Sequence, residues 1–190
     1  MPEDQPKWYQ SVNDDGILMQ GDLIYGCPYI IPPTEVSVGA RIEANVIAYD
    51  VIILTQSCDL EKDNLELVLV CPFWPLKEIE EKIPQLKDDN LKESAKRGYQ
   101  PAWVILDALG EKGFLVVDFR YTYSVPIETL KALITQNPSR WRLNSPYREH
   151  LSQEFAKFFM RVGLPIGIPH FSRFTINYCR KCPVNHSVRE

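Results

Sequence analysis

Five consecutive side chains could donate or accept hydrogen bonds, attack an electrophile or bind a metal ion: Thr55, Gln56, Ser57, Cys58 and Asp59. They directly follow the apolar residues 51–54, whose β-branched composition predicts a short buried strand. Polar groups at the end of such a strand form either a turn or a site held in fixed geometry. We favour the turn, in which Thr55, Ser57 and Asp59 bond to exposed backbone groups.

Cys58 is the candidate nucleophile of this stretch. A thiol attacks as the thiolate, so it needs a cation or a helix start that lowers its pKa, and usually a histidine base. The histidines all lie far away in the sequence, at positions His150, His170 and His186. The charge of Asp59 would raise the pKa of the thiol rather than lower it. A Cys58-dependent hydrolase, with Thr55 and Asp59 as further candidate catalytic residues, is therefore an alternative to the turn.

A second group of chemically capable residues lies near the end of the chain: His170, Cys179, Cys182 and His186. A Cys-x-x-Cys pair followed by a histidine offers soft ligands at the spacing of a zinc knuckle. Only one cysteine pair is present, however, and Pro183 crowds it. We favour a tail with incidental thiols, with zinc as the alternative and the only cofactor that the sequence suggests.

A third group interleaves cations with aromatic rings, in Arg140-Trp141-Arg142 and Tyr147-Arg148. Guanidinium groups and stacked rings suit phosphates and single-stranded bases. From Pro138 onward the chain carries nine Lys and Arg against three Asp and Glu, whereas residues 1–137 carry twelve against twenty-two. The favoured interpretation is structural: Trp141 and Tyr147 pack under the predicted barrel while the arginines pair with acidic strands. The alternative is a surface that faces a polyanion.

Asp118 and Arg120 form a fourth pair, at the end of the apolar run 114–117. Alternation along a strand would place both side chains on one face, opposite Phe119. The sequence therefore predicts an ion pair within the chain.

The totals describe an ordinary globular protein. With 190 residues, 45% hydrophobic and 24% charged, the chain fits one domain with a substantial core. No apolar run approaches the ~20 residues that cross a bilayer. The start Met1-Pro2-Glu3-Asp4 lacks the features of a signal peptide, so we expect a cytoplasmic protein with reduced cysteines and no membrane partner. Cys27 and Cys71 lie in strand-like runs and should be buried.

The elements that would position these groups are mostly short strands. The sequence predicts strands over residues 17–31, 40–49, 51–54, 65–73, 101–109 and 113–123, with an inserted pair of short helices over 75–97 broken at Pro84. A short helix should cover 126–136. A longer one should begin at Ser145 as its cap and Pro146 as its first residue, and end before Gly163. Residues 1–15 read as a flexible arm, 16–163 as the domain and 164–190 as a tail.

Three of these segments resemble the PemK/MazF family of bacterial toxin-type endoribonucleases: Gly21-Asp22-Leu23-Ile24, the run Val51-Ile52-Ile53-Leu54-Thr55, and Leu67-Val68-Leu69-Val70-Cys71-Pro72. The resemblance covers residues 21–73 and implies a small barrel with a packed helix, RNA as substrate and a toxin–antitoxin setting. The family has a catalytic arginine just before its second strand, where this chain has Ile47-Ala48-Tyr49-Asp50. The stretch Thr55–Asp59 is also similar to one in uncharacterised bacterial and phage-linked proteins.

We therefore expect an α+β fold: a small, strongly bent antiparallel β-barrel with inserted helices and a C-terminal packing helix. The leading functional hypothesis is a module without catalysis that binds a partner protein or nucleic acid. Its binding residues would be Gln56 and Ser57 beside the strand end, with Arg140, Trp141 and Arg148. The alternatives are an endoribonuclease that uses Arg120 or Arg142 as its arginine, and the Cys58-dependent hydrolase. A homodimer is a further expectation.

Overall fold

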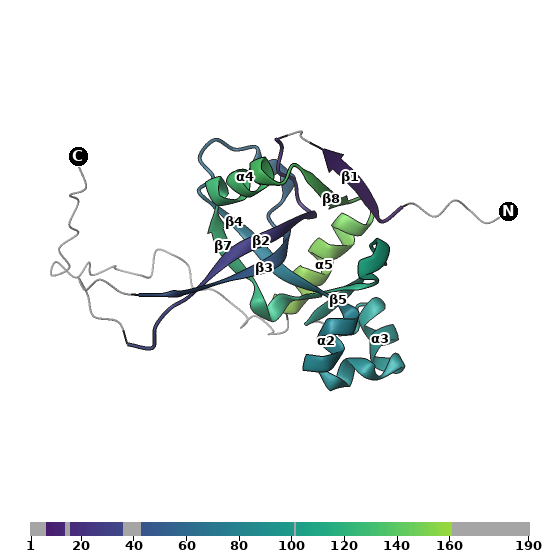
Figure 1. Cartoon of the computed structure of the whole chain (residues 1–190). Helices are drawn as coiled ribbons and strands as arrows, with labels where there is room; N and C mark the ends of the chain where they lie inside the picture. Colours follow the sequence, from purple (N-terminus) through teal and green to yellow (C-terminus); the bar gives the residue numbers. More distant parts are fainter. Residues whose placement is uncertain (1–6, 14–15, 36–42, 101, 161–190) are drawn as a thin grey trace, which may run out of the picture.

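The described residues form an eight-stranded antiparallel sheet with five α-helices, so the α+β prediction is confirmed (Figure 1). The structure, a computed structural model, describes residues 7–13, 16–35, 43–100 and 102–160. The elements are β1 (Tyr9–Asn13), β2 (Asp22–Ile31), β3 (Asn45–Ile53), α1 (Ser57–Leu60), β4 (Leu67–Pro75), α2 (Leu76–Lys82), α3 (Asp89–Lys96), β5 (Trp103–Leu106), β6 (Leu115–Asp118), β7 (Tyr123–Pro126), α4 (Ile127–Gln136), β8 (Ser139–Leu143) and α5 (Tyr147–Phe159).

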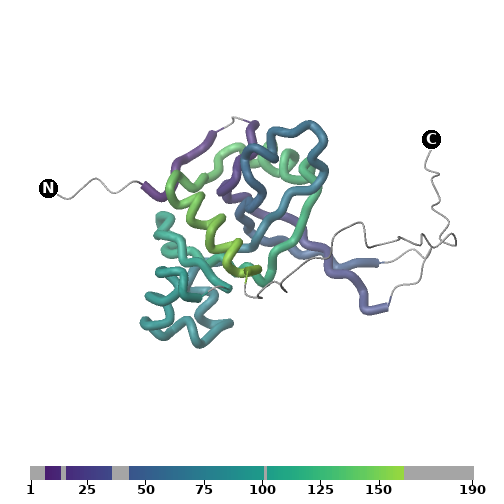
Figure 2. Tube along the Cα trace, turned by 180° about the vertical axis from the view of Figure 1, so that it is seen from behind, coloured from purple at the N-terminus to yellow at the C-terminus, as the bar shows by residue number. Residues whose placement is uncertain are grey.

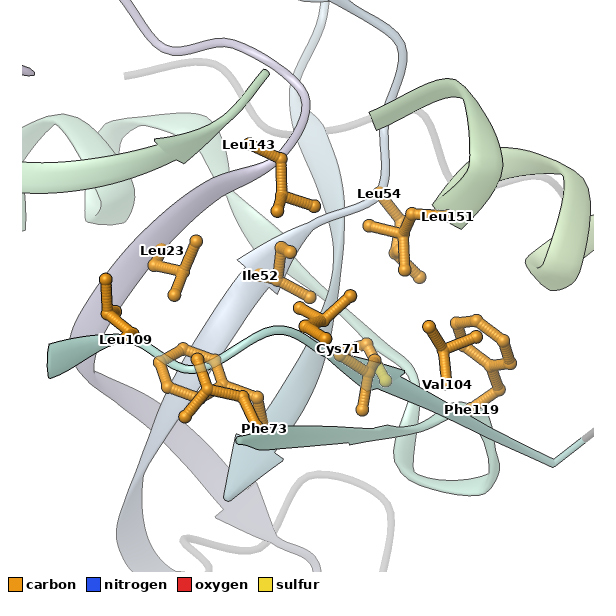
Figure 3. Packing of buried hydrophobic residues seen from close by; sticks show 13 residues of the cluster. Leu23, Ile52, Leu54, Cys71, Phe73, Val104, Leu109, Phe119, Leu143 and Leu151 are labelled. Atoms are coloured by element: carbon orange, nitrogen blue, oxygen red, sulfur yellow. The ribbon is translucent and has the colours of Figure 1, made fainter. Parts of the chain in front are cut away.

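The sheet does not close into a barrel, and that part of the prediction is wrong. The strands follow the order β1-β8-β2-β3-β4-β6-β5, and β7 pairs with β4 beside this path. No pairing joins β1 to β5 among the described residues. Helix α5 covers the open side instead: Leu151 is fully buried against a cluster that includes Ile52 and Leu143 (Figure 3). A packed helix can seal a core as well as strand closure can.

The strand over residues 51–53 lies at the centre, as predicted. Val51, Ile52 and Ile53 have no exposed surface. Ile52 points into the cluster under α5, whereas Val51 and Ile53 point into a second cluster that includes Leu130 of α4. Because both faces of the sheet are covered here, the strand is apolar without alternation.

Strand β1 corrects the predicted flexible arm of residues 1–15. Residues 9–13 pair with β8 from Tyr9 opposite Leu143 to Asn13 opposite Ser139. Two of these residues hold the strand against the rest of the protein. Val12 is buried, and Tyr9 donates a hydrogen bond to the carbonyl of Asp107 at 2.8 Å. The sheet therefore begins inside the segment that the composition assigned to an arm.

The helical insert of residues 75–97 is confirmed. Helices α2 and α3 flank a 3-10 turn at Pro84–Lys87, where proline interrupts the helix. Ile79, Leu86 and Ala95 are buried against Ile105 and Val116, so the insert forms its own small core beside β5 and β6. Figure 1 shows this lobe at one end of the molecule.

Helix α5 also forms as predicted, with one difference at its start. The residue that caps it is Pro146 rather than Ser145, and no side chain bonds to the first turn. The Ser145–Pro146 peptide bond is cis. Within the described residues, every helix is too short or too polar to cross a bilayer.

Candidate functional site

The polar stretch after β3 is tied to the backbone around it. The Thr55 hydroxyl accepts a hydrogen bond from the backbone N–H of Leu69 at 2.7 Å. The Ser57 hydroxyl accepts one from the backbone N–H of Gln20 at 3.2 Å, and residues 57–60 form the single turn α1. Two of the polar groups in the stretch therefore satisfy backbone donors, as the predicted strand-ending turn requires.

Gln20 connects this strand end to helix α5. Its buried side-chain amide donates to the carbonyl of Leu54 at 2.7 Å and to the Ser152 hydroxyl at 2.8 Å. Neither Gln20 nor Ser152 was identified from the sequence. Gln20 could have been singled out because it directly precedes Gly21-Asp22, whereas no neighbouring residue in the sequence distinguishes Ser152.

A cleft of about 610 Å³ opens at this junction. We name it the α1–α5 cleft; its lining residues are Gln20, Leu54, Thr55, Gln56, Asp59, Ser152, Phe155, Ala156, Phe159 and Met160. Its floor is polar and comes from the strand end, while its wall is apolar and comes from the last turns of α5. Phe159 and Met160 are 62% and 77% exposed. Exposed apolar side chains that adjoin one another often mark an interaction surface.

Cys58 lies at the edge of this region, exposed, with its thiol 3.7 Å from the Gln56 side-chain oxygen. No hydrogen bond joins it to a basic side chain in the described part of the chain. His150, the histidine that the structure describes, lies on α5 with its ring nitrogen 3.8 Å from Glu154. Asp59 forms an ion pair with Lys62 at 2.5 Å, and this contact raises the pKa of Lys62. Among the described residues, no histidine therefore pairs with Cys58.

Arg140 and Arg142 are buried in an ion-pair cluster around Asp22. The Nε atom of Arg140 lies 2.9 Å from an Asp22 oxygen, and Arg142 binds the same carboxylate through Nε and Nη2. Both guanidinium groups also donate to the carbonyl of Ile17, at 2.5 and 2.8 Å. The predicted pairing with an acidic strand is confirmed.

Trp141 differs from its prediction. It alternates with the two buried arginines along β8, so its ring points the other way and is 39% exposed. Arg148, the other proposed binding residue, pairs with Glu149 at 2.9 Å. The structure does not gather Trp141, Arg148 and the two arginines of β8 into one exposed basic surface.

Asp118 and Arg120 form the predicted ion pair. Asp118 is fully buried. Its carboxylate forms an ion pair with the Arg120 guanidinium at 2.5 Å and accepts a hydrogen bond from the Trp103 ring nitrogen at 2.9 Å. The guanidinium also lies over the Trp103 ring, 5.1 Å from its centre. Contact with Asp118 raises the pKa of Arg120. Arg120 lies in the 3-10 turn Phe119–Tyr121 that follows β6, rather than on the strand itself.

The remaining cysteines offer no second nucleophile within the described chain. Cys27 and Cys71 are buried as predicted. The Cys71 thiol donates to the carbonyl of Asp118 at 3.1 Å, and burial raises its pKa to about 12. At neutral pH it is therefore a protonated, inert thiol.

The zinc candidates His170, Cys179, Cys182 and His186 lie outside the described residues. Within the described ranges, no three His, Cys, Asp or Glu side chains come together in a way that could hold a metal ion. No protein-family model and no curated protein matches this sequence.

Proposed function

We propose that this chain is a binding module that holds a segment of a partner protein in the α1–α5 cleft. The observation that carries the proposal is the combination of an exposed apolar wall and a polar floor whose geometry is fixed by the Gln20 hydrogen bonds. Peptide-binding sites combine an apolar pocket for an anchoring side chain with a few positioned polar groups.

The apolar wall favours a side chain that is itself large and apolar. Phe155, Phe159 and Met160 line one side of the cleft. Phe155 and Phe159 contact each other edge to face, with ring centres 5.1 Å apart, so the wall is preformed. Methionine adapts its shape to varied partners, and aromatic residues are enriched in protein interfaces.

The charges favour a protein segment over nucleic acid. None of the residues that line the cleft is basic, and the charged one among them, Asp59, is already paired with Lys62. The nearby guanidinium groups of Arg140 and Arg142 are buried against Asp22. Binding of single-stranded nucleic acid requires a basic groove that follows the backbone.

The hydrogen bonds favour binding over catalysis. The Thr55 and Ser57 hydroxyls accept from backbone N–H groups, and the Cys58 thiol meets an amide oxygen. A nucleophile would instead contact a general base that is itself oriented by a third group. The arrangement holds the loop in shape.

The ribonuclease alternative rests on the order of the strands. The three segments that resemble the PemK/MazF family fall in the neighbouring strands β2, β3 and β4. Of the two arginines proposed for it, Arg142 is 5% exposed, and Arg120 is held by Asp118. A catalytic arginine must reach the phosphate, so this alternative receives less support than the binding module.

Peptide selection tests the proposal. Displayed random peptides would be selected on the full chain, and their affinities measured by calorimetry for the native protein, Phe159→Asp and Met160→Asp. Losing burial of one large apolar side chain, worth about 1.5–3 kcal/mol, should weaken binding about tenfold or more. Leu67→Asp is the matched control, because Leu67 is 55% exposed and does not line the cleft.

Two results would count against the binding module. In one, selected peptides bind Phe159→Asp and Met160→Asp as tightly as the native chain. In the other, the native chain cleaves labelled single-stranded RNA and Arg120→Ala does not, which would favour the ribonuclease.

A further inference from the structure

A two-stranded extension of the sheet projects from the body of the molecule, and it is a different surface from the α1–α5 cleft. It consists of residues 27–31 of β2 and 45–49 of β3, which we name the ribbon. Figures 1 and 2 show it leaving the sheet on the side away from the helical insert. Ile30 and Val46 are directly opposite each other on it and are 63% and 62% exposed.

The ribbon separates from the sheet because β4 changes partners. β4 pairs with β3 only at Val51, Ile52 and Ile53, and its residues 73–75 pair with β6 instead. A cleft of about 660 Å³ lies between residues 48–50 of β3 and 73–75 of β4. Among the described strands, none pairs with the outer edge of β3 over residues 45–50.

The two edges of the ribbon differ in how they are protected. Strand β2 contains Pro28, which lacks a backbone N–H, and an irregularity between Ile24 and Cys27 where Gly26 has a φ of 70°. Proline and bulges are the features by which edge strands avoid pairing with other chains. Residues 45–49 of β3 contain neither proline nor a charged side chain. Within the described parts of the chain, the β2 edge is therefore blocked and the β3 edge is open.

We infer that the open edge of β3 pairs with the same edge of a second copy of this chain, forming a closed two-fold dimer. The ribbon suits its own copy because residues 27–31 and 45–49 have no charged side chain, so two copies meet without repulsion. Because the β2 edge is blocked, the pairing ends at two chains and does not continue into a filament.

The uncharged stretch of residues 45–49 favours a two-fold axis at its central residue, Ile47. An antiparallel pair centred on Ile47 places Val46 of each copy opposite Ala48 of the other, and Asn45 opposite Tyr49. This register pairs only uncharged residues over 45–49. Beyond them, Glu43 of one copy comes near Asp50 of the other, where Lys112, 3.6 Å from the Asp50 carboxylate, offsets the repulsion. The apolar surface of Ile30 and Val46 then becomes continuous across four strands.

Sedimentation equilibrium of the full chain tests the inference. The native chain should have twice its monomer mass of 22.0 kDa. Val46→Lys places a charge at the contact and should raise the dissociation constant of the dimer about tenfold or more. Leu67→Lys, at a similarly exposed apolar residue elsewhere on the sheet, should remain as dimeric as the native chain. Circular dichroism checks that both variants fold.

A cross-link tests the register. Residues directly opposite each other in an antiparallel pair lie within disulfide reach, so Ile47→Cys in a Cys58→Ser background should form a disulfide between copies, identified by peptide mass mapping. Leu67→Cys in the same background should form none at that position. A monomeric native chain overturns the inference, as does a dimer that Val46→Lys leaves intact or an absence of the Ile47→Cys disulfide.

Discussion

Arg142 and Asp22 form a buried ion pair between β8 and the start of β2, 120 residues apart in the sequence. Asp22 has no exposed surface and also binds Arg140. The Ile17 carbonyl accepts a further hydrogen bond from each of the two guanidinium groups. The cluster joins β8 and β2, the second and third strands in the sheet order.

Asp22→Asn should destabilise the protein severely. It removes the charge that two buried arginines share, and breaking a buried pair costs about 3–5 kcal/mol. Urea unfolding followed by tryptophan fluorescence measures the loss. Lys131→Ala is the control, because it removes an exposed pair with Glu128 and should leave the unfolding free energy unchanged. A native-like unfolding midpoint for Asp22→Asn would show that the cluster contributes little to stability.

Gln20→Ala should loosen the floor of the α1–α5 cleft. The buried Leu54 carbonyl would lose its side-chain donor, and an unsatisfied buried group costs about 1–3 kcal/mol. The same variant should weaken binding of peptides selected on the native chain. Gln10→Ala, at an exposed residue of β1, serves as the control. Unchanged stability and unchanged peptide affinity together would mean that Gln20 does not shape the cleft.

Gly98→Ala should destabilise more than a backbone effect alone. Gly98 has a φ of 73°, and an added Cβ would lie 2.7 Å from the carboxylate of Glu154. Glu154 is 2% exposed and held by Lys157 at 2.6 Å, so it cannot easily move away. Gly110 also has a positive φ, but its Cβ would meet no atom within 4 Å.

Comparing the two glycines separates the cost of a left-handed backbone conformation from the cost of a steric clash at the added Cβ. Gly110→Ala should cost about 1–2 kcal/mol for its left-handed backbone. Gly98→Ala should cost clearly more in thermal unfolding measured at equal protein concentration. Equal costs would indicate that the chain around Glu154 yields without difficulty.

Stability should fall as the pH rises above 9. The pKa of Cys71 is raised from 9.0 to about 12 by burial, so between these values the unfolded chain loses a proton that the folded chain keeps. The stabilisation is complete below about pH 9 and is lost as the pH approaches 12, with a slope of about 1.4 kcal/mol per pH unit for one group. Burial also raises the pKa of Tyr9 and Tyr123, which adds to the effect.

Urea unfolding at pH 8 and pH 10 measures this dependence. Cys71→Ala should reduce the difference between the two pH values, because one of the groups responsible is removed. Cys58→Ala should not, since Cys58 is exposed. The same difference in native and Cys71→Ala chains would rule out a contribution from this thiol.

The sequence predicted the parts of the fold that depend on local patterns. Apolar spacing and proline or glycine signals predicted the antiparallel pair β3 and β4, the insert broken at Pro84, and helices α4 and α5. The predicted strand over residues 113–123 is interrupted, because Asp118 accepts from the backbone N–H of Arg120 and turns the chain between β6 and β7.

What the sequence missed depends on distant partners. Strand β8 lacks a recognisable apolar pattern, because Arg140 and Arg142 lie on its buried face. Their burial is stabilised by ion pairs with Asp22, which is distant in the sequence. Strand β1 is polar and becomes a strand through β8. The α1–α5 cleft likewise requires α5 to lie beside the end of β3, which no spacing in the sequence reveals.

The two-sided burial of β3 has a consequence for alignment of the strands. Where only one face is apolar, a slip of one residue exposes the whole apolar set and is strongly disfavoured. Val51, Ile52 and Ile53 are buried on both faces, so turning them to the opposite face exposes less apolar surface than in such a strand, and hydrophobicity defines the register less sharply. The bond from the Leu69 N–H to the Thr55 hydroxyl, and that from Gln20 to the Leu54 carbonyl, exist in one alignment only. Hydrogen bonds at the end of the strand therefore hold its register.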